Sequence, residues 1–126
     1  MAELPSIYKL LSAQATLNKR LEHLTKARQY VAEGWTRGEF EKDGRVCAFG
    51  ALNKAVHGSA TASSGVGVLA DLFEKYIPGG GIISVWNDRQ KSKKPVLAVF
   101  DKAIADIQAA LDKVNSDIAK TPTVTL

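Results

Sequence analysis

Apolar residues recur at alternating spacings of three and four near both ends of the chain, which is the pattern of an amphipathic helix. The first stripe predicts a helix over residues 6–33, which Gly34 ends. The last predicts a helix over residues 95–120, with Ser92 as N-cap and Pro95 in its first turn. The stripe positions are Ile7, Leu10, Gln14, Leu17, Leu21, Leu24, Arg28 and Val31 in the first helix and Leu97, Phe100, Ile104, Ile107, Leu111, Val114 and Ile118 in the last.

Such heptad-like stripes are typical of helices that pair along a seam, so we expect the two terminal helices to pack antiparallel. At 1.5 Å per residue each helix could reach roughly 35–40 Å, more than a domain of this size needs to cover its own core. We therefore expect part of the seam to bind another chain, either a second copy in a homo-oligomer such as a dimer, or a host protein. The residues expected at that contact are Leu10, Leu17, Ile107, Leu111, Val114 and Ile118, with Gln14 setting the register.

Shorter patterns in the middle of the chain predict a small β-hairpin and two shorter helices. Asp43-Gly44 is a turn signal, and the residues on either side of it, 39–41 and 45–47, are expected to form the two strands. The two helices are expected at residues 47–56 and 66–77, and a loop of small residues at 59–65 lies between them. Residues 82–86 are expected to form a short strand or extended segment.

The composition fits one compact domain. The 126 residues are 45% apolar and 24% charged, which is ordinary for a globular protein. A chain of this size needs neither a metal nor a disulfide to fold, and one cysteine cannot form an internal disulfide. No leader or membrane-length apolar run is visible, so we expect a cytoplasmic protein. We also expect no cofactor. The prediction is a single mainly α domain over residues 1–126, with the middle segments packed on one side of the paired terminal helices.

Positive charge is concentrated after the second tryptophan. The net charge is +4 with a pI near 9.3. Four basic residues fall within six positions, namely Arg89, Lys91, Lys93 and Lys94. Such a run could bind phosphate, an acidic protein or nucleic acid. Because no aromatic residues are interleaved with it, the pattern favours a solvated loop.

Cys47 is a candidate nucleophile, because it stands at the start of a predicted helix, where the helix dipole lowers the pKa of a thiol. Its partner base would be His57 or His23. Asn87 or Asp88 would orient that base. However, His57 lies ten residues on in the same predicted helix, roughly 15 Å along its axis and beyond hydrogen-bond reach. The apolar neighbours of Cys47 favour an inert, buried thiol instead.

Both tryptophans belong to short motifs. One is W-x-x-G, with Trp35 and Gly38, and the other is W-N-D, with Trp86, Asn87 and Asp88. An Asn-Asp pair in front of a helix more often caps backbone groups than binds a ligand, and it supplies too few ligands for a metal. We therefore expect these residues to fix loops around packed tryptophans, with no metal site.

Gly50 lies inside a predicted helix, where glycine costs about 1 kcal/mol relative to alanine. We expect a tryptophan ring or a crossing helix to come close to its backbone, with a ligand as the third alternative. The three glycines at 79–81 lack the Lys-Ser/Thr of a phosphate-binding loop, so they are interpreted as a turn.

Taken in order, the motifs W-x-x-G at Trp35, D-G-R-x-C-A-x-G-A-L at Asp43 and W-N-D at Trp86 resemble a known family. It consists of small uncharacterised proteins from actinobacteria and their phages, classed as a domain of unknown function. The resemblance covers roughly residues 20–107 and implies a shared fold but no activity. Residues 1–19 and 108–120 would then be helical extensions, and residues 121–126 a short tail.

Three functional hypotheses follow from these patterns. The favoured one is a non-catalytic interaction or regulatory accessory protein, encoded by a phage or an actinobacterium and acting in the cytoplasm of the host. The runner-up is a cysteine-dependent enzyme that uses Cys47. The third is a nucleic-acid-binding module that uses the basic run from Arg89 to Lys94.

Overall fold

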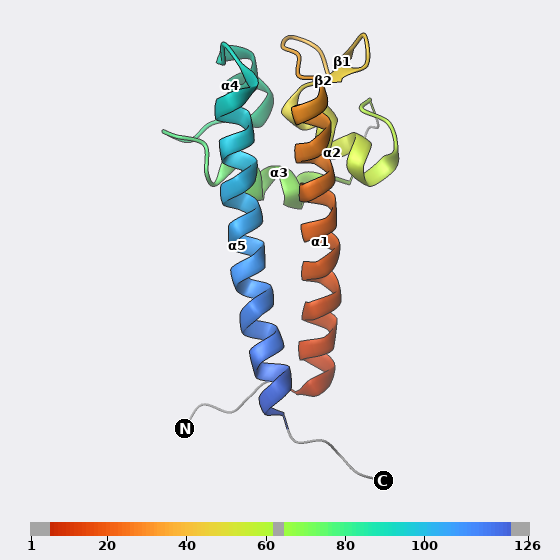
Figure 1. Ribbon diagram of the computed structural model, residues 1–126, viewed down its shortest axis with the longest axis vertical. Helices are drawn as coiled ribbons and strands as arrows, with labels where there is room; N and C mark the ends of the chain where they lie inside the picture. The colour runs from red at the N-terminus through yellow and green to blue at the C-terminus, as the bar shows by residue number, and fades with distance from the viewer. Residues whose placement is uncertain (1–5, 62–64, 122–126) are drawn as a thin grey trace.

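Two long antiparallel helices form the main support of the fold. In the computed structural model, which describes residues 6–61 and 65–121, helices α1 and α5 lie side by side (Figure 1). The described elements are α1 (Ile7–Glu33), β1 (Glu41–Lys42), β2 (Arg45–Val46), α2 (Ala48–His57), α3 (Gly67–Glu74), α4 (Ile83–Arg89) and α5 (Lys93–Lys120). The prediction of a mainly α fold with paired terminal helices and a small hairpin is therefore confirmed.

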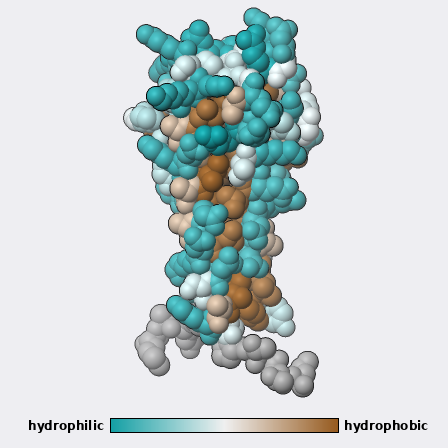
Figure 2. All heavy atoms as spheres, in the orientation of Figure 1, coloured by the Kyte–Doolittle hydropathy of each residue, from teal (hydrophilic) through white to brown (hydrophobic). Residues whose placement is uncertain are grey.

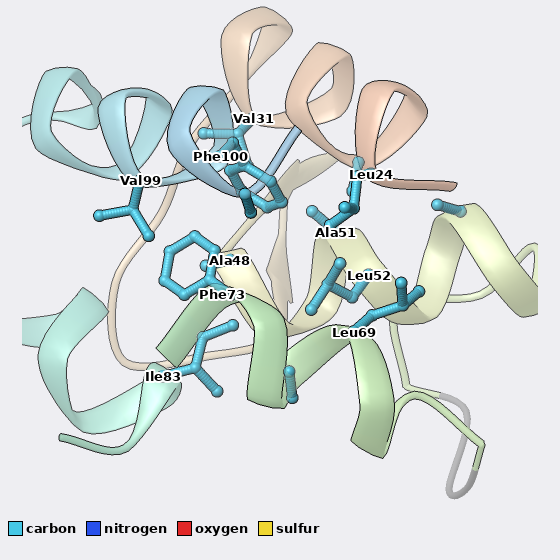
Figure 3. Close-up of a cluster of buried hydrophobic side chains, with 14 of the residues drawn as sticks. Leu24, Val31, Ala48, Ala51, Leu52, Leu69, Phe73, Ile83, Val99 and Phe100 are labelled. Carbon is cyan, nitrogen blue, oxygen red and sulfur yellow. The ribbon is translucent and has the colours of Figure 1, made fainter. Parts of the chain in front are cut away.

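The shorter elements gather at one end of the helix pair. Helices α2, α3 and α4 pack on one face of α1 and α5, and the hairpin lies at the tip (Figures 1 and 3). In the hairpin, Glu41 pairs with Val46 and Lys42 with Arg45 in antiparallel fashion. Farther from the hairpin, α1 and α5 continue as a pair. We call this part, residues 7–20 and 109–120, the stem.

Two polar contacts fix the register of α1 against α5. The guanidinium of Arg28 donates to the carboxylate of Asp101, and the Gln14 amide donates to Asn115 at 2.8 Å. The two contacts are separated by fourteen positions in both helices, in opposite chain directions, as antiparallel pairing requires. The Arg28–Asp101 pair is largely exposed, so it contributes more to register than to stability.

The core lies between the α1–α5 pair and the three short helices. Its largest fully buried apolar side chains come mainly from four helices and include Leu24, Val31, Leu52, Phe73 and Phe100 (Figure 3). The Phe73 ring lies 4.8 Å from the ring of Phe100 and 5.8 Å from that of Trp86, edge-on in both cases. Such aromatic pairs stabilise a core beyond the area that they bury. Trp86 thus fastens α4 to α3.

Polar groups also fix both ends of α1. At its start, the Ser6 hydroxyl accepts a hydrogen bond from the backbone N–H of Lys9 at 3.3 Å. At its end, the Lys93 ammonium donates to the carbonyl of Ala32 at 2.6 Å, which would otherwise have no helical partner. Gly34 is the C-cap, as predicted. One member of the basic run therefore joins the start of α5 to the end of α1.

The prediction of a strand at residues 82–86 is wrong, because this segment begins α4. Ile83 and Asn87 lie four residues apart and are both buried, which fits one face of a helix and not the alternation of a strand. The Glu74 carboxylate accepts a hydrogen bond from the backbone N–H of Ile83 at 2.8 Å and so stabilises the helix start. Three short helices, not two, therefore lie between the terminal helices.

The other boundaries differ little from the predictions. The helix expected at residues 47–56 corresponds to α2, with Cys47 as its N-cap. The helix expected at residues 66–77 contains α3 and a following turn that buries Ile77. Ser92 is the N-cap residue of α5, although its side chain makes no capping bond.

Candidate functional site

The side chain of Asn87 connects three segments behind the hairpin, namely the loop at Trp35 and Thr36, the start of α2, and α4. Its Oδ1 accepts hydrogen bonds from the indole N–H of Trp35 at 2.8 Å and from the backbone N–H of Ala48 at 3.1 Å. Its Nδ2 donates to the carbonyl of Thr36 at 3.2 Å and to the carboxylate of Asp88 at 3.3 Å. Asn87 is fully buried, and in all four contacts its amide oxygen accepts and its amide nitrogen donates. This residue therefore acts as a structural clamp.

Asp88 extends this network to the loop that precedes the hairpin. The carboxylate oxygen that meets Asn87 also accepts a hydrogen bond from the backbone N–H of Gly38 at 2.8 Å. Gly38 has a φ of 79°, a left-handed conformation that favours glycine. The polar groups of W-N-D thus bind the W-x-x-G loop, and they are used in holding the tip together.

Cys47 is buried at the N-cap of α2, where only 2% of it is exposed. Its Sγ accepts a hydrogen bond from the backbone N–H of Gly50 at 3.3 Å. Burial raises the pKa of the thiol and outweighs the hydrogen bonds from Gly50 and Phe49 that lower it, while nearby Asp88 raises it further. The thiol is therefore neutral at physiological pH, whereas nucleophilic attack requires the thiolate.

We expect the Cys47 thiol of the folded protein to react at least about 100-fold more slowly with a disulfide reagent at pH 8 than the thiol of the unfolded chain. Its raised pKa predicts that the rate in the folded protein keeps rising as the pH passes the ordinary range of cysteine. Absorbance kinetics with and without denaturant measure both rates. Complete reaction of the folded protein within seconds at pH 7 would instead show an activated thiol.

The structure does not bring either histidine to Cys47. His57 is the last residue of α2 and Cys47 caps its first turn, so the two are separated by roughly 15 Å of helix. His23 belongs to α1 and lines a hollow beside Val56 and Val68. The predicted thiol–imidazole pair is therefore not assembled.

The group that comes close to Gly50 is the backbone of Phe40, and not the tryptophan ring or crossing helix that we expected. A methyl group at this position would overlap the carbonyl oxygen of Phe40 and lie 2.9 Å from its carbonyl carbon. The same carbonyl accepts a hydrogen bond from the backbone N–H of Cys47 at 3.2 Å. The Phe40 and Phe49 rings also pack at 5.4 Å between centroids. Glycine here lets the hairpin approach the first turn of α2.

A cavity of about 400 Å³ opens between the segment from Gly38 to Cys47, Thr61 in the loop after α2, and α4. Its wall includes the carboxylate-bearing residues Glu39, Glu41 and Asp88, together with Phe40 and Ser84. These groups would attract a small cationic group, yet among the described residues no three His, Cys, Asp or Glu side chains are grouped to hold a metal ion. Sequence spacing could not reveal this cavity, because it is assembled from three separate segments.

The seam residues predicted to bind a partner lie mainly against the other long helix of the same chain. Three of them are buried, namely Leu10, Ile107 and Leu111. Three are half-buried, namely Leu17, Val114 and Ile118. The amide of Gln14 bonds to Asn115, so it sets a register within the chain. The chain buries much of this seam by itself.

The basic run is divided by the structure. Lys93 bonds to α1, as described above, whereas Arg89, Lys91 and Lys94 are exposed around the junction of α4 and α5. Arg37 reaches the same junction and donates to the carbonyl of Gln90 at 3.1 Å. The run therefore combines a structural lysine with a solvated turn.

Comparison with known proteins supports the resemblance seen in the sequence. The model of a family of unknown function, DUF6197, matches residues 16–106, well over half of the chain. This range includes both tryptophan motifs and the clamp around Asn87, and it leaves out most of the stem. No curated protein and no solved structure matches the chain. In the part of the chain that the structure describes, no helix combines the length and apolar character needed to cross a membrane. The chain belongs to DUF6197, a family of unknown function.

Proposed function

We propose that this protein is a non-catalytic interaction module, an accessory protein of a phage or an actinobacterium that acts by binding protein. The observation that carries the proposal is an apolar strip along the α1–α5 pair that the chain buries only in part. Helices α2, α3 and α4 cover one face of this pair, and no layer of the described residues covers the opposite face (Figures 1 and 3). Figure 2 shows apolar residues running down that open face, most densely at the far end of the stem.

Helix periodicity identifies the residues of this strip. Positions spaced by three and four share one side of a helix, so the exposed contacts of Arg28 with Asp101 and of Gln14 with Asn115 mark the open side. The apolar residues in line with these contacts form what we call the strip, namely Ile7, Leu11, Leu21, Leu97, Ile104 and Ile118. Leu11 is 45% exposed, which is unusual for a leucine on the apolar side of a helix.

The charges of the two long helices support a second copy of the chain as the partner. Between residues 7 and 28, α1 carries five Lys or Arg and one Glu, whereas between residues 101 and 117, α5 carries four Asp and two Lys. In a two-fold dimer with both tips at the same end, each α1 would face the α5 of the other chain. Opposite charges would then flank the strip, and the four helices would form an antiparallel bundle.

We expect the protein to sediment as a dimer at roughly 100 μM, and Leu11→Glu or Ile104→Glu to raise the dissociation constant at least about tenfold, because each places a charge in the strip. Sedimentation velocity measures the association, and thermal melts confirm that the variants remain folded. The matched control is Ile82→Glu, since Ile82 is 63% exposed and lies outside the strip. A wild-type protein that stays monomeric up to about 0.5 mM contradicts the dimer.

The two other hypotheses have less support. A cysteine-dependent enzyme would need a thiolate and a nearby base, and Cys47 is buried, neutral at physiological pH and far from His57 along α2. A nucleic-acid-binding module would need the basic run as a contact surface, and Lys93 is engaged with α1.

A further inference from the structure

A basic groove runs beneath the short helices, on the opposite side of the fold from the strip. It consists of two neighbouring hollows of about 400 and 310 Å³, which share Thr16 and Arg20. The lower hollow is bordered by α1, and the upper one lies between α1, the end of α2 and the start of α3. We call the two hollows together the groove.

The groove has a cationic rim and an apolar floor. Its cationic or titratable side chains are Lys9, Lys19, Arg20 and His23, and no carboxylate of a described residue lines either hollow. Among the described residues, Lys19 alone of these four has a carboxylate within salt-bridge distance, namely exposed Glu22 at 3.8 Å. The floor is formed by Leu17, Val56, Val68 and Leu69, and Val68 is 52% exposed.

This combination determines the kind of ligand that fits. Cations at the rim attract an anionic partner. A ligand that also has an apolar face binds more tightly, because it buries apolar surface against the floor. A phosphate backbone would satisfy the rim and leave the floor uncovered, and none of the described residues that line the groove is aromatic and able to stack on bases. An acidic amphipathic helix satisfies both, in the helix-in-groove mode of recognition.

We propose that the groove binds an acidic amphipathic helix of a partner protein. From Lys9 to His23 the groove follows fourteen residue-to-residue steps of α1, or about 21 Å, so a partner helix of about 14 residues would fill it. Arg20 borders both hollows and faces the middle of the partner, and Val68 provides the exposed apolar contact. This site is independent of the dimer contact, because it lies on the covered side of the α1–α5 pair.

The test uses a fluorescent peptide of about 14 residues, with leucines spaced three and four apart and glutamates at most other positions. We expect Arg20→Glu to weaken its binding at least about tenfold and Val68→Ser to weaken it roughly threefold to tenfold. The matched control is Lys102→Glu, the same change of charge at an exposed position of α5 outside the groove, which should alter binding less than about twofold. Fluorescence anisotropy measures affinity, and thermal melts show that each variant is folded.

Three outcomes overturn the proposal. The first is equal binding of a peptide with the same composition but scattered leucines, which would show attraction by charge alone. The second is tighter binding of a DNA oligonucleotide of similar charge that Arg20→Glu abolishes, which would assign the groove to nucleic acid. The third is no binding of the amphipathic peptide at concentrations up to about 1 mM. Because the dimer is measured with strip variants in the absence of peptide, either proposal can fail without the other.

Discussion

Replacing Asn87 with alanine is expected to lower the free energy of unfolding by about 4 kcal/mol. The change removes an acceptor from the indole of Trp35 and from the buried backbone N–H of Ala48, and a donor from the carbonyl of Thr36. Each buried group left without a partner costs about 1–3 kcal/mol, and the shortened side chain also leaves a cavity. For a domain of this size, the melting temperature should fall by roughly 15 °C.

Two further variants distinguish the loss of the hydrogen bonds of Asn87 from the effect of replacing any asparagine. Trp35→Phe removes one donor and keeps most of the ring, so it should cost about 1–2 kcal/mol. Asn18→Ala changes an exposed asparagine in the middle of α1 and should leave stability within about 0.5 kcal/mol of the wild type or raise it slightly. Chemical unfolding followed by circular dichroism measures all three. An Asn87→Ala protein as stable as Asn18→Ala would disprove the structural role of the clamp.

Gly50→Ala is expected to destabilise the fold by about 3 kcal/mol or more, although alanine is the better helix former. The new methyl group would collide with the carbonyl of Phe40, and backbone cannot turn aside as a flexible side chain can. The carbonyl could withdraw only by stretching its hydrogen bond from Cys47. The hairpin should therefore detach from α2, and the melting temperature should fall by roughly 10 °C or more.

The natural control for this substitution is Gly67→Ala. Gly67 is exposed in the first turn of α3, and no heavy atom lies within 4 Å of the position that its methyl group would take. Because alanine also reduces the entropy of the unfolded chain, Gly67→Ala should be neutral or stabilise by up to about 1 kcal/mol. Thermal melts of both variants, side by side, give the comparison. Equal melting temperatures would mean that the close approach at Gly50 has no energetic weight.

The terminal helices could be predicted because each contains several turns of regular apolar spacing. Leu10, Leu24 and Val31 repeat on one side of α1 and are buried where the pattern places them. The short helix α4 could not be predicted in the same way, since its seven residues complete only about two turns. Its apolar start, Ile82 and Ile83, therefore looked like a strand.

The candidate site was predictable in its residues but not in its contacts. The motifs singled out Trp35, Gly38, Asn87 and Asp88, and the structure joins all four in one network. The partners are about fifty positions apart in the chain, and no local pattern encodes such a distance. The neighbour of Gly50 was missed for a related reason, because the group that approaches it is a backbone carbonyl and carries no side-chain signal.

One side of the groove could be predicted from the periodicity of α1, and the other could not. Ser12, Thr16, Arg20 and His23 follow one another at spacings of four, four and three, so a polar stripe on α1 is visible in the sequence. Its meaning depends on the apolar groups of α2 and α3 that complete the upper hollow, and those come together only when the chain folds.

The two register contacts between α1 and α5 restrict how the length of this protein can change. An insertion of seven residues in α1 alone, between Gln14 and Arg28, would lengthen that helix by about 10 Å. One of the two contacts would then lose its partner. Equal insertions in both helices would preserve both contacts and the apolar spacing. Lengthening or shortening of the protein along its long axis is therefore tolerated only as a matched change in two distant parts of the sequence, in steps of about two helical turns.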